Sequence, residues 1–203
     1  MKVSRVRDTQ NYQTPPVEIK ISRVWAMPNR QTFSVKPIGE FVRRWLEGSQ
    51  ITVDPFSGGG GWANYTNDLN PDLHAAYHLD AREFLIALRE QGVLCDALLF
   101  DPPYSPRQLA ECYRNIGRTV GMKDTQSRTW STWRDEAARL IRPRGIALSF
   151  GWNTVGFGKN RGFAIEEILL VCHGGMHNDT ICLAERRVSE PPPRKAKRVP
   201  AST

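Results

Sequence analysis

The sequence predicts an α/β protein with a binding site at the carboxyl edge of an open sheet. A short strand predicted at residues 51–53 ends at Asp54, and the apolar run 97–100 ends at Asp101. Proline follows each aspartate, and a glycine cluster, residues 58–61, follows the predicted strand. An apolar run that stops at proline is typical of a buried strand at its carboxyl end, which is where open α/β sheets bind ligands.

The bulk composition indicates one globular, intracellular domain. The chain has 203 residues, of which 40% are hydrophobic and 24% are charged, enough for a real core. Its net charge of +7 and its isoelectric point of about 9.5 favour a polyanionic partner. The four cysteines form no CxxC pair, no signal peptide is recognisable, and no apolar run could span a bilayer. We therefore expect a cytoplasmic protein without a membrane partner.

The chain is predicted to have three parts. We expect an extended amino-terminal arm over residues 1–21, a single domain over residues 22–188 and a tail over residues 189–203. The arm mixes basic and polar residues and could touch phosphates, although a solvated terminus is the simpler interpretation. The tail is basic and rich in proline, a composition typical of disordered segments.

Strands and helices alternate through the first half of the domain. Residues 22–37 are rich in turn formers and are expected to be irregular. Pro37 suits the first turn of a helix, and apolar residues follow at helical spacing, so a helix is predicted over residues 37–47. The other elements predicted here are strands at 51–53, 65–67 and 95–100, and a helix that starts after Asp80.

The second half is predicted to hold two helices and three strands. Apolar residues from Leu109 to Ile116 recur at helical spacing, and residues 117–131 are predicted to form a loop. A further helix is expected to continue until Pro143-Arg144-Gly145 ends it. The predicted strands are 146–150, 165–171 and 180–184, of which the last two are joined by a hairpin-like connection.

Three acidic or glycine-rich positions are candidates for binding a nucleotide-like ligand. The glycines that follow Asp54 let the backbone approach a ligand closely, although a glycine loop alone is weak evidence. Asp68 follows the second predicted strand, where a ribose is usually held. Asp80 could cap the next helix or accept a hydrogen bond from an adenine amino group.

The segment Asp101-Pro102-Pro103-Tyr104 suits the methylation of an exocyclic amino group on a base. The lone pair of such a nitrogen is delocalised into the ring, so the nitrogen is a poor nucleophile. The Asp101 carboxylate and the Pro102 carbonyl can accept its two hydrogens and direct the lone pair at a methyl donor. Proline keeps this geometry stiff, and Tyr104 offers a face for a flipped base. The alternative is a strand followed by a tight Pro-Pro turn.

Basic and aromatic residues are interleaved in the region after this segment, which suits contact with a nucleic acid. A solvated helix face explains some of them equally well. The candidates for nucleic-acid contact are Arg107, Arg114, Lys123, Arg128 and Trp130.

A metal site built from His173 and His177 with Cys172 or Cys182 is a weak alternative elsewhere. The Gly-Gly and Asn-Asp pairs among these residues are turn formers, so no metal site is predicted.

Several motifs in one order resemble a known family. DPFSGGG followed by an acid, then HLDAREFL, then DPPY, is similar to the S-adenosylmethionine-dependent amino-methyltransferases, specifically the DNA adenine-N6 methyltransferases. WAMPN, TFSVKPI, TNDLNP, DPPYSPRQ and HNDT resemble the small phage-type adenine methylases, so the resemblance covers residues 22–187. It implies a Rossmann-like class I methyltransferase fold, with a seven-stranded, mostly parallel sheet, helices on both faces and an antiparallel last strand.

The resemblance also implies roles for individual residues. Asp68 would take the ribose hydroxyls of S-adenosylmethionine, Asp80 and the backbone of Ala81 its adenine, and Asp101 to Tyr104 the target base, with Asp101 also beside the cofactor. The residues that would hold the methionine part are Phe33, Ser34, Lys36, Asp54, Pro55, Phe56, Ser57 and Gly58.

The implied reaction is methyl transfer from S-adenosylmethionine to adenine N6 in double-stranded DNA, in the host cytoplasm if the protein is phage-encoded. RNA, cytosine N4 and guanine N2 stay open as targets, as does a non-catalytic nucleic-acid-binding protein of the same fold, and the oligomeric state is open. Two features depart from the family. Only seven residues separate Gly60 from Asp68, too few for the usual helix as well as a strand, and no separate target-recognition domain is evident.

Overall fold

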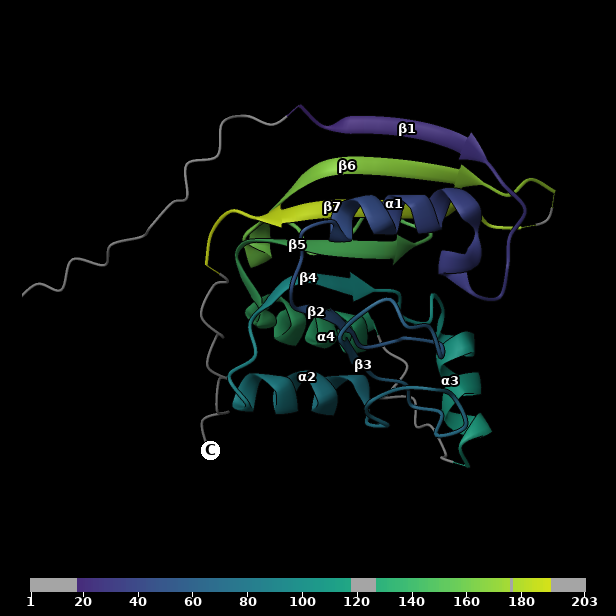
Figure 1. Ribbon diagram of the computed structural model, residues 1–203. Coiled ribbons are helices and arrows are strands. Elements are labelled where there is room, and N and C mark those ends of the chain that lie inside the picture. The colour runs from purple at the N-terminus through teal and green to yellow at the C-terminus, as the bar shows by residue number, and fades with distance from the viewer. Residues whose placement is uncertain (1–17, 118–126, 176, 191–203) are drawn as a thin grey trace, which may run out of the picture.

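A single seven-stranded sheet organises the residues described by this computed structural model, 18–117, 127–175 and 177–190 (Figure 1). Its strand order is β1-β6-β7-β5-β4-β2-β3. Only β7 is antiparallel to its neighbours β5 and β6, so the predicted sheet is confirmed. The strands are β1 (Lys20–Trp25), β2 (Thr52–Asp54), β3 (Tyr65–Thr66), β4 (Cys95–Phe100), β5 (Ile141–Gly151), β6 (Phe163–Cys172) and β7 (Thr180–Arg187).

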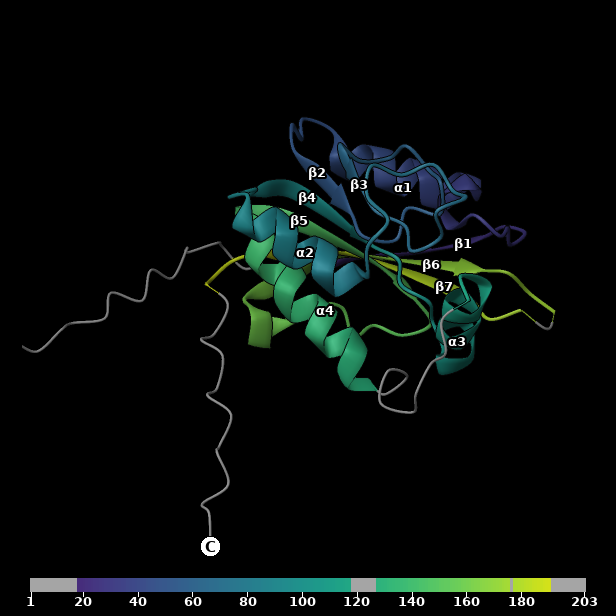
Figure 2. The ribbon, with the colours of Figure 1, turned by 90° about the horizontal axis from the view of Figure 1, so that it is seen from below.

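Helices cover both faces of the sheet. Helix α1 lies on one face, α2 and α4 lie on the other, and α3 lies beyond the carboxyl ends of the parallel strands (Figures 1 and 2). The helices are α1 (Lys36–Leu46), α2 (Ala81–Glu90), α3 (Pro106–Asn115) and α4 (Ser127–Leu140), with short 3-10 turns η1 (Thr32–Ser34) and η2 (Lys159–Arg161). None of the helices in the described ranges is long and apolar enough to cross a membrane.

The central strand β4 shows why its sequence is continuously apolar. Its side chains alternate between two cores, as strand geometry requires. Ala97 and Leu99 belong to the core under α1, whereas Leu98 and Phe100 belong to the core under α2 and α4. All six residues of β4 are buried, because both faces of this part of the sheet are covered.

The prediction that residues 22–37 are irregular is wrong in part, because β1 occupies Lys20–Trp25. It pairs in parallel with β6, with Ile21 opposite Ile168, and supplies the seventh strand at the sheet edge. The predicted arm therefore enters the sheet at Lys20. Four of the six β1 side chains are exposed and none is buried, so the apolar residues of this segment do not show the pattern of a buried strand.

Two predicted boundaries around α4 are also wrong. Residues 127–131 were predicted to form a loop, but α4 begins at Ser127. The same helix ends at Leu140, and Ile141 already pairs with Cys95 as part of β5. The register then shifts between Cys95 and Ala97, and Arg144 has a φ of 66°. An irregular start to β5 therefore replaces the helical turn predicted up to Pro143.

The other predicted elements are confirmed within a few residues. Pro37 lies in the first turn of α1, Asp80 caps α2 and Ser105 caps α3. No helix is described between β2 and β3, as the short spacing between Gly60 and Asp68 predicted.

Candidate functional site

The predicted acidic residues meet at one edge of the sheet. Strand β2 pairs with both β3 and β4, so the carboxyl ends of these three strands lie together. Asp54 ends β2, Asp68 follows β3 and Asp101 follows β4. They lie close enough that the charges of Asp101 and Asp68 both raise the pKa of Asp54.

Asp101 is held as a hydrogen-bond acceptor. Burial raises the pKa of its carboxyl to about 6, while hydrogen bonding from the Tyr104 and Thr32 hydroxyls opposes that rise. Burial and the neighbouring Asp101 charge raise the pKa of Tyr104, so its phenol stays protonated and donates to Asp101. At neutral pH Asp101 is therefore mostly ionised. The resemblance pointed to residues around Thr32 but missed Thr32 itself.

The loop that follows Asp101 is fixed by partners on α3 and α4. The backbone N–H of Tyr104 donates to Gln108 Oε1 over 2.7 Å, and the indole N–H of Trp130 donates to the Pro103 carbonyl over 2.8 Å. The Tyr104 ring meets Trp152 edge to face, with ring centroids 5.5 Å apart. Trp152 lies just beyond β5, and no sequence pattern predicts its contact with Tyr104.

The loop after β2 contains buried polar atoms without partners. Asp54 is fully buried, and burial is the main reason why its pKa rises to about 8. Its Oδ1 accepts from the Phe56 N–H over 3.0 Å, but Asp54 Oδ2 and the buried Ser57 Oγ have no hydrogen-bond partner among the described residues. Buried polar atoms are usually satisfied, so this pair fits a polar ligand in the loop.

The glycine loop and Asp68 are joined directly. Gly58 and Gly59 have φ values of 56° and 80°, a backbone conformation that favours glycine. The Gly58 N–H donates to Asp68 Oδ2 over 2.9 Å, and the Asn70 N–H donates to Asp68 Oδ1 over 2.9 Å. Each carboxylate oxygen keeps acceptor capacity for a ligand hydroxyl.

Asn67, which the sequence placed only in a strand, braces this edge of the site. Its side chain is fully buried. The amide donates to the carbonyls of Pro55 over 3.1 Å and Leu79 over 3.0 Å, and its oxygen accepts from the Leu79 N–H over 2.9 Å. Asn67 therefore ties the loop after β2 to the segment that enters α2. A lone asparagine beside a strand carries no sequence signal for this role.

Asp80 adopts the capping role that the sequence left open. Its Oδ1 accepts from the Arg82 N–H over 2.9 Å, and its Oδ2 accepts from the Tyr113 hydroxyl over 2.5 Å. Ala81, the first residue of α2, is buried. These contacts place Asp80 between α2 and α3, at the same edge as Asp68.

The residues expected to hold the methionine part are less closely grouped. Phe33 is buried in the core under α1, with its ring centroid 4.7 Å from that of Phe150. Ser34 is exposed and donates to the Gln31 carbonyl over 2.7 Å, and Lys36 is exposed at the start of α1. Phe33 thus supports the site by packing.

The predicted nucleic-acid residues that the structure describes lie on α3 and α4. Arg107 pairs with Glu111 on α3 over 2.9 Å, and Arg114 donates to the Ala110 carbonyl over 3.3 Å. Arg128 is exposed at the start of α4, Trp130 is turned onto Pro103, and Lys123 lies outside the described residues.

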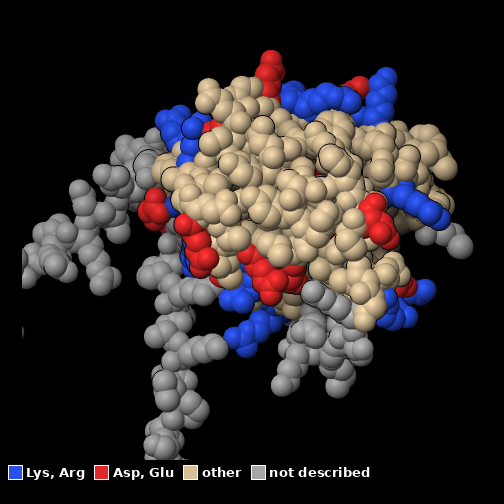
Figure 3. Space-filling view, turned by 60° about the horizontal axis from the view of Figure 1, so that its bottom comes forward, with Lys and Arg blue, Asp and Glu red and all other residues tan. Residues whose placement is uncertain are grey.

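The positive charge of the chain is unevenly distributed. Ranges 1–17, 118–126 and 191–203 contain nine basic and two acidic residues, which is the whole excess of seven. The described residues hold 19 of each sign. Figure 3 accordingly shows a broad area without lysine or arginine across the middle of one face.

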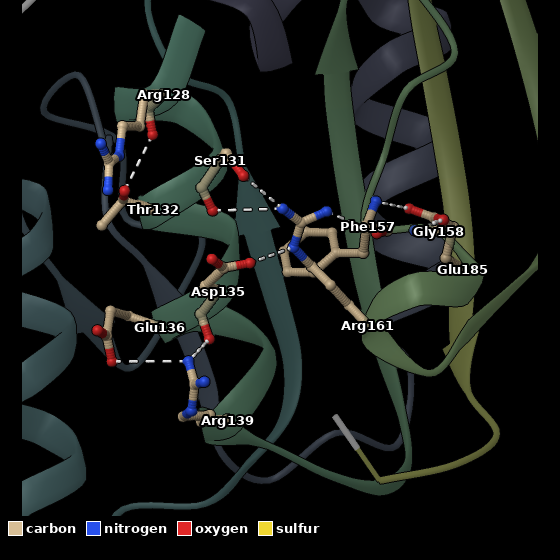
Figure 4. Close-up of polar contacts among 10 residues, drawn as sticks. All are labelled: Arg128, Ser131, Thr132, Asp135, Glu136, Arg139, Phe157, Gly158, Arg161 and Glu185. Carbon is tan, nitrogen blue, oxygen red and sulfur yellow. Dashed lines mark hydrogen bonds and ion pairs between the residues drawn. The ribbon is translucent and has the colours of Figure 1, made fainter. Parts of the chain in front are cut away.

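A partly buried polar network anchors α4, the helix that carries Trp130 (Figure 4). Arg161 pairs with Asp135 over 2.7 Å and donates to Ser131 Oγ over 2.8 Å and to the Phe157 carbonyl over 3.1 Å. Glu185 on β7 accepts from the backbone N–H of Phe157 over 2.7 Å, and burial raises the pKa of its carboxyl. The network joins α4 to the loop after β5 and to β7.

Within the described ranges, no cluster of three or more histidine, cysteine, aspartate or glutamate side chains could hold a metal ion. The buried His173 donates from Nδ1 to the Ala26 carbonyl over 2.7 Å, and its Nε2 is hydrogen-bonded to Thr180 Oγ1 over 2.9 Å. It thus links the end of β6 to β7 and to the segment after β1.

No family model and no curated protein matches the sequence. Among solved structures, NSun6 from Pyrococcus horikoshii with SFG matches with a TM-score of 0.50 and 16% identity, over 73% of this chain and 51% of that chain. TrmN from Thermus thermophilus matches with a TM-score of 0.46 and 17% identity, over 75% and 49% of the two chains. An M1.HpyAVI–SAM complex matches with a TM-score of 0.36 and 18% identity, over 56% and 53%.

The protein has the Rossmann-like fold of methyltransferases. It spans about half the length of these three solved structures. At this level of identity the similarity shows the fold alone.

Proposed function

We propose that the protein transfers a methyl group from S-adenosylmethionine to the N6 amino group of adenine in double-stranded DNA, with the base flipped out of the helix. The observation that carries the proposal is the adjacency of two sites on neighbouring strands. Asp101 to Tyr104 end β4, and the loop with Asp54 and Asp68 lies at the ends of β2 and β3. An amino-group acceptor and a cofactor loop at one edge suit direct transfer between two bound molecules.

The residues at this edge fit S-adenosylmethionine. The unpartnered Asp54 Oδ2 and Ser57 Oγ suit its methionine part, and the glycines after Ser57 allow close approach. Asp68 and Asp80 keep lone pairs for the ribose and the adenine amino group. When bound, the cofactor supplies an activated methyl group on a sulfonium. Ser34 and Lys36, both exposed near η1, stay in this proposal as residues that complete the methionine end.

The target base is oriented by fixed acceptors. The Asp101 carboxylate and the Pro102 carbonyl accept the two amino hydrogens, so that the nitrogen lone pair points toward the methyl group. The nitrogen forms a bond to the methyl carbon as the carbon–sulfur bond breaks. The methylated nitrogen is acidic and gives its proton to water, so no strong base is needed. Tyr104 and Trp152 present aromatic surface beside the amino group.

The basic residues outside the described ranges supply the charge that a nucleic acid needs. A body with equal numbers of basic and acidic residues gains little from the phosphate backbone, whereas the arm, the tail and residues 118–126 carry the excess. Arg107, Arg114 and Arg128 add cations on α3 and α4 beside the base site.

Labelling with a radioactive methyl group from S-adenosylmethionine tests the proposal. The protein is incubated with mixed double-stranded DNA and RNA, and each product is digested to nucleosides that are identified by mass. N6-methyladenine in the DNA fraction supports the proposal. Label in RNA, on cytosine N4 or on guanine N2 would show that the proposed target, adenine in DNA, is wrong, although the proposed methyl transfer to an amino group would stand. Nucleic-acid binding without any label in the product would contradict the proposal that the protein is an enzyme.

A further inference from the structure

The glycine loop has one large side chain to hold it. Residues 57–64 read Ser-Gly-Gly-Gly-Gly-Trp-Ala-Asn, and no helix follows them before β3. Four successive glycines have more conformational freedom than any other tetrapeptide, so an unrestrained loop would adopt many shapes. Trp62 is the one large apolar residue in this stretch.

Hydrogen bonds fix the two ends of the loop. At the first end, the Ser57 N–H donates to the Asn67 carbonyl over 2.9 Å, and the Gly58 N–H donates to Asp68 Oδ2 over 2.9 Å. At the second end, Asn64 Oδ1 accepts from the Thr52 N–H over 2.8 Å. Within the loop, the Gly60 N–H also donates to the Ser57 carbonyl over 2.7 Å. The stretch from this bond to Asn64, residues 61–63, is the part that depends on packing.

The Trp62 indole packs that middle stretch against α1 and η1. It meets Phe33 edge to face at a centroid distance of 5.8 Å, and the Arg43 guanidinium carbon lies 5.2 Å from its ring centroid. It belongs to the partly buried residues around the core under α1. Cation–π and edge-to-face contacts each add to the area that the ring buries.

Two glycines lie beside the Trp62 indole, Gly60 in the loop and Gly39 on α1. A Cβ atom on Gly60 would lie 3.0 Å from Trp62 Cδ1, and a Cβ atom on Gly39 of α1 would lie 3.5 Å from Trp62 Cη2. The same Gly39 Cβ would lie only 2.6 Å from the Phe33 carbonyl oxygen. Glycine at position 60 therefore leaves room for the ring, whereas glycine at position 39 lets α1 lie against the Phe33 carbonyl, beside the ring.

We propose that Trp62 is a positioning residue that holds the glycine loop in the shape that binds S-adenosylmethionine. This inference rests on the cofactor site of the proposed function. Trp62 acts through Gly60 and the loop backbone, and it takes over the restraint that a helix after the loop would give. Without the indole, the loop must be ordered when the cofactor binds, and that ordering lowers affinity.

Calorimetry with S-adenosylmethionine tests the inference on Trp62→Ala, Trp62→Phe and the control Trp45→Ala. Trp45 is another partly buried tryptophan, but it lies on α1 itself, and its indole N–H donates to Glu167 on β6 over 3.0 Å. We expect Trp62→Ala to weaken binding at least about tenfold, through a less favourable entropy, and Trp62→Phe to restore part of the affinity. Trp45→Ala should lower the melting temperature and leave the affinity within about twofold of wild type.

Hydrogen exchange of the loop amides gives a second measurement that needs no cofactor. The amides of residues 58–61 should exchange faster in Trp62→Ala and at the wild-type rate in Trp45→Ala. Unchanged exchange in Trp62→Ala overturns the inference, as does an affinity equal to that of Trp45→Ala. If the wild-type protein binds no S-adenosylmethionine, the proposed function fails, and the exchange result still decides whether Trp62 orders the loop.

Discussion

Replacing Asp54 by asparagine should stabilise the ligand-free protein above pH 5 while weakening its binding of S-adenosylmethionine. Burial, helped by the charges of Asp101 and Asp68, raises the pKa of Asp54 to about 8. In an unfolded chain an aspartate titrates near pH 4. A carboxyl whose pKa is raised by folding favours the fold fully below about pH 4, and this stability is lost as the pH rises toward about 8.

The size of the effect follows from the distance between the two pKa values. Between them, each pH unit removes about 1.4 kcal/mol from the free energy of unfolding. Asp54 alone should therefore remove about 3 kcal/mol between pH 5 and pH 7. Asparagine is neutral at every pH, so at this position it makes no pH-dependent contribution to the free energy of unfolding. Asp101, with its pKa near 6, is present in both proteins, so its own contribution cancels in the comparison.

Urea unfolding at pH 5, 6 and 7 measures this difference for the wild-type protein and Asp54→Asn. Asp72→Asn is the matched control, because Asp72 is an exposed aspartate in the neighbouring loop. The stability gap between Asp54→Asn and wild type should widen by about 3 kcal/mol from pH 5 to pH 7, while Asp72→Asn runs parallel to wild type. A gap that stays constant with pH would refute the buried, largely neutral carboxyl. Calorimetry should show weaker cofactor binding in Asp54→Asn, because the cofactor's ammonium group would favour the ionised form of Asp54, a form that an amide cannot adopt.

The remaining predictions concern the base site and its supports. Asp101→Ala should abolish methylation and largely spare cofactor binding, as labelling and calorimetry would show; retained turnover would exclude the proposed acceptor role. The methylation rate should rise through about pH 6, because Asp101 accepts hydrogens only when ionised, and its pKa is about 6; a flat profile from pH 5 to pH 8 would contradict this. Asn67→Ala should lower the free energy of unfolding by about 2–4 kcal/mol in urea titrations, because three buried or partly buried backbone groups lose their partner, and a loss below about 1 kcal/mol would argue against the brace. Arg161→Ala should cost about 2–4 kcal/mol by the same assay, whereas Arg114→Ala, which removes an exposed arginine, should cost under about 0.5 kcal/mol; equal losses would deny the network its structural role.

The parts of the fold that sequence could predict are those where both faces of an element are buried or one face is clearly apolar. Strand β4 is apolar throughout, and α1 repeats its apolar residues at helical spacing after Pro37, so both were placed closely. Strand β1 could not be predicted, because four of its six side chains stay exposed at the sheet edge and none is buried. The start of β5 was missed because a register shift lets Ile141 pair with Cys95 across an irregular turn.

The candidate site was predictable where chemistry restricts residue type. Aspartate and proline after a buried strand located Asp101 and Asp54, and the spacing located Asp68. Thr32, Asn67 and Trp152 act through distant contacts that no local pattern encodes. Phe33 was assigned by resemblance to the cofactor, yet its ring lies in the core, because packing under α1 takes the whole side chain.

The pairing of β1 with β6 restricts the order in which the strands can assemble into the sheet. The two strands are separated by about 150 positions in the sequence, so β1 leaves the ribosome long before its partner exists. At about 5–20 residues per second, Ile21 and Trp25 wait for roughly 7 to 30 s without a neighbouring strand. Closing so long a loop is also slow, since its entropy is lost before the contacts form. Strand β1 can therefore join the sheet only after β6 has been made, and until then its exposed edge is a segment that a chaperone would need to shield.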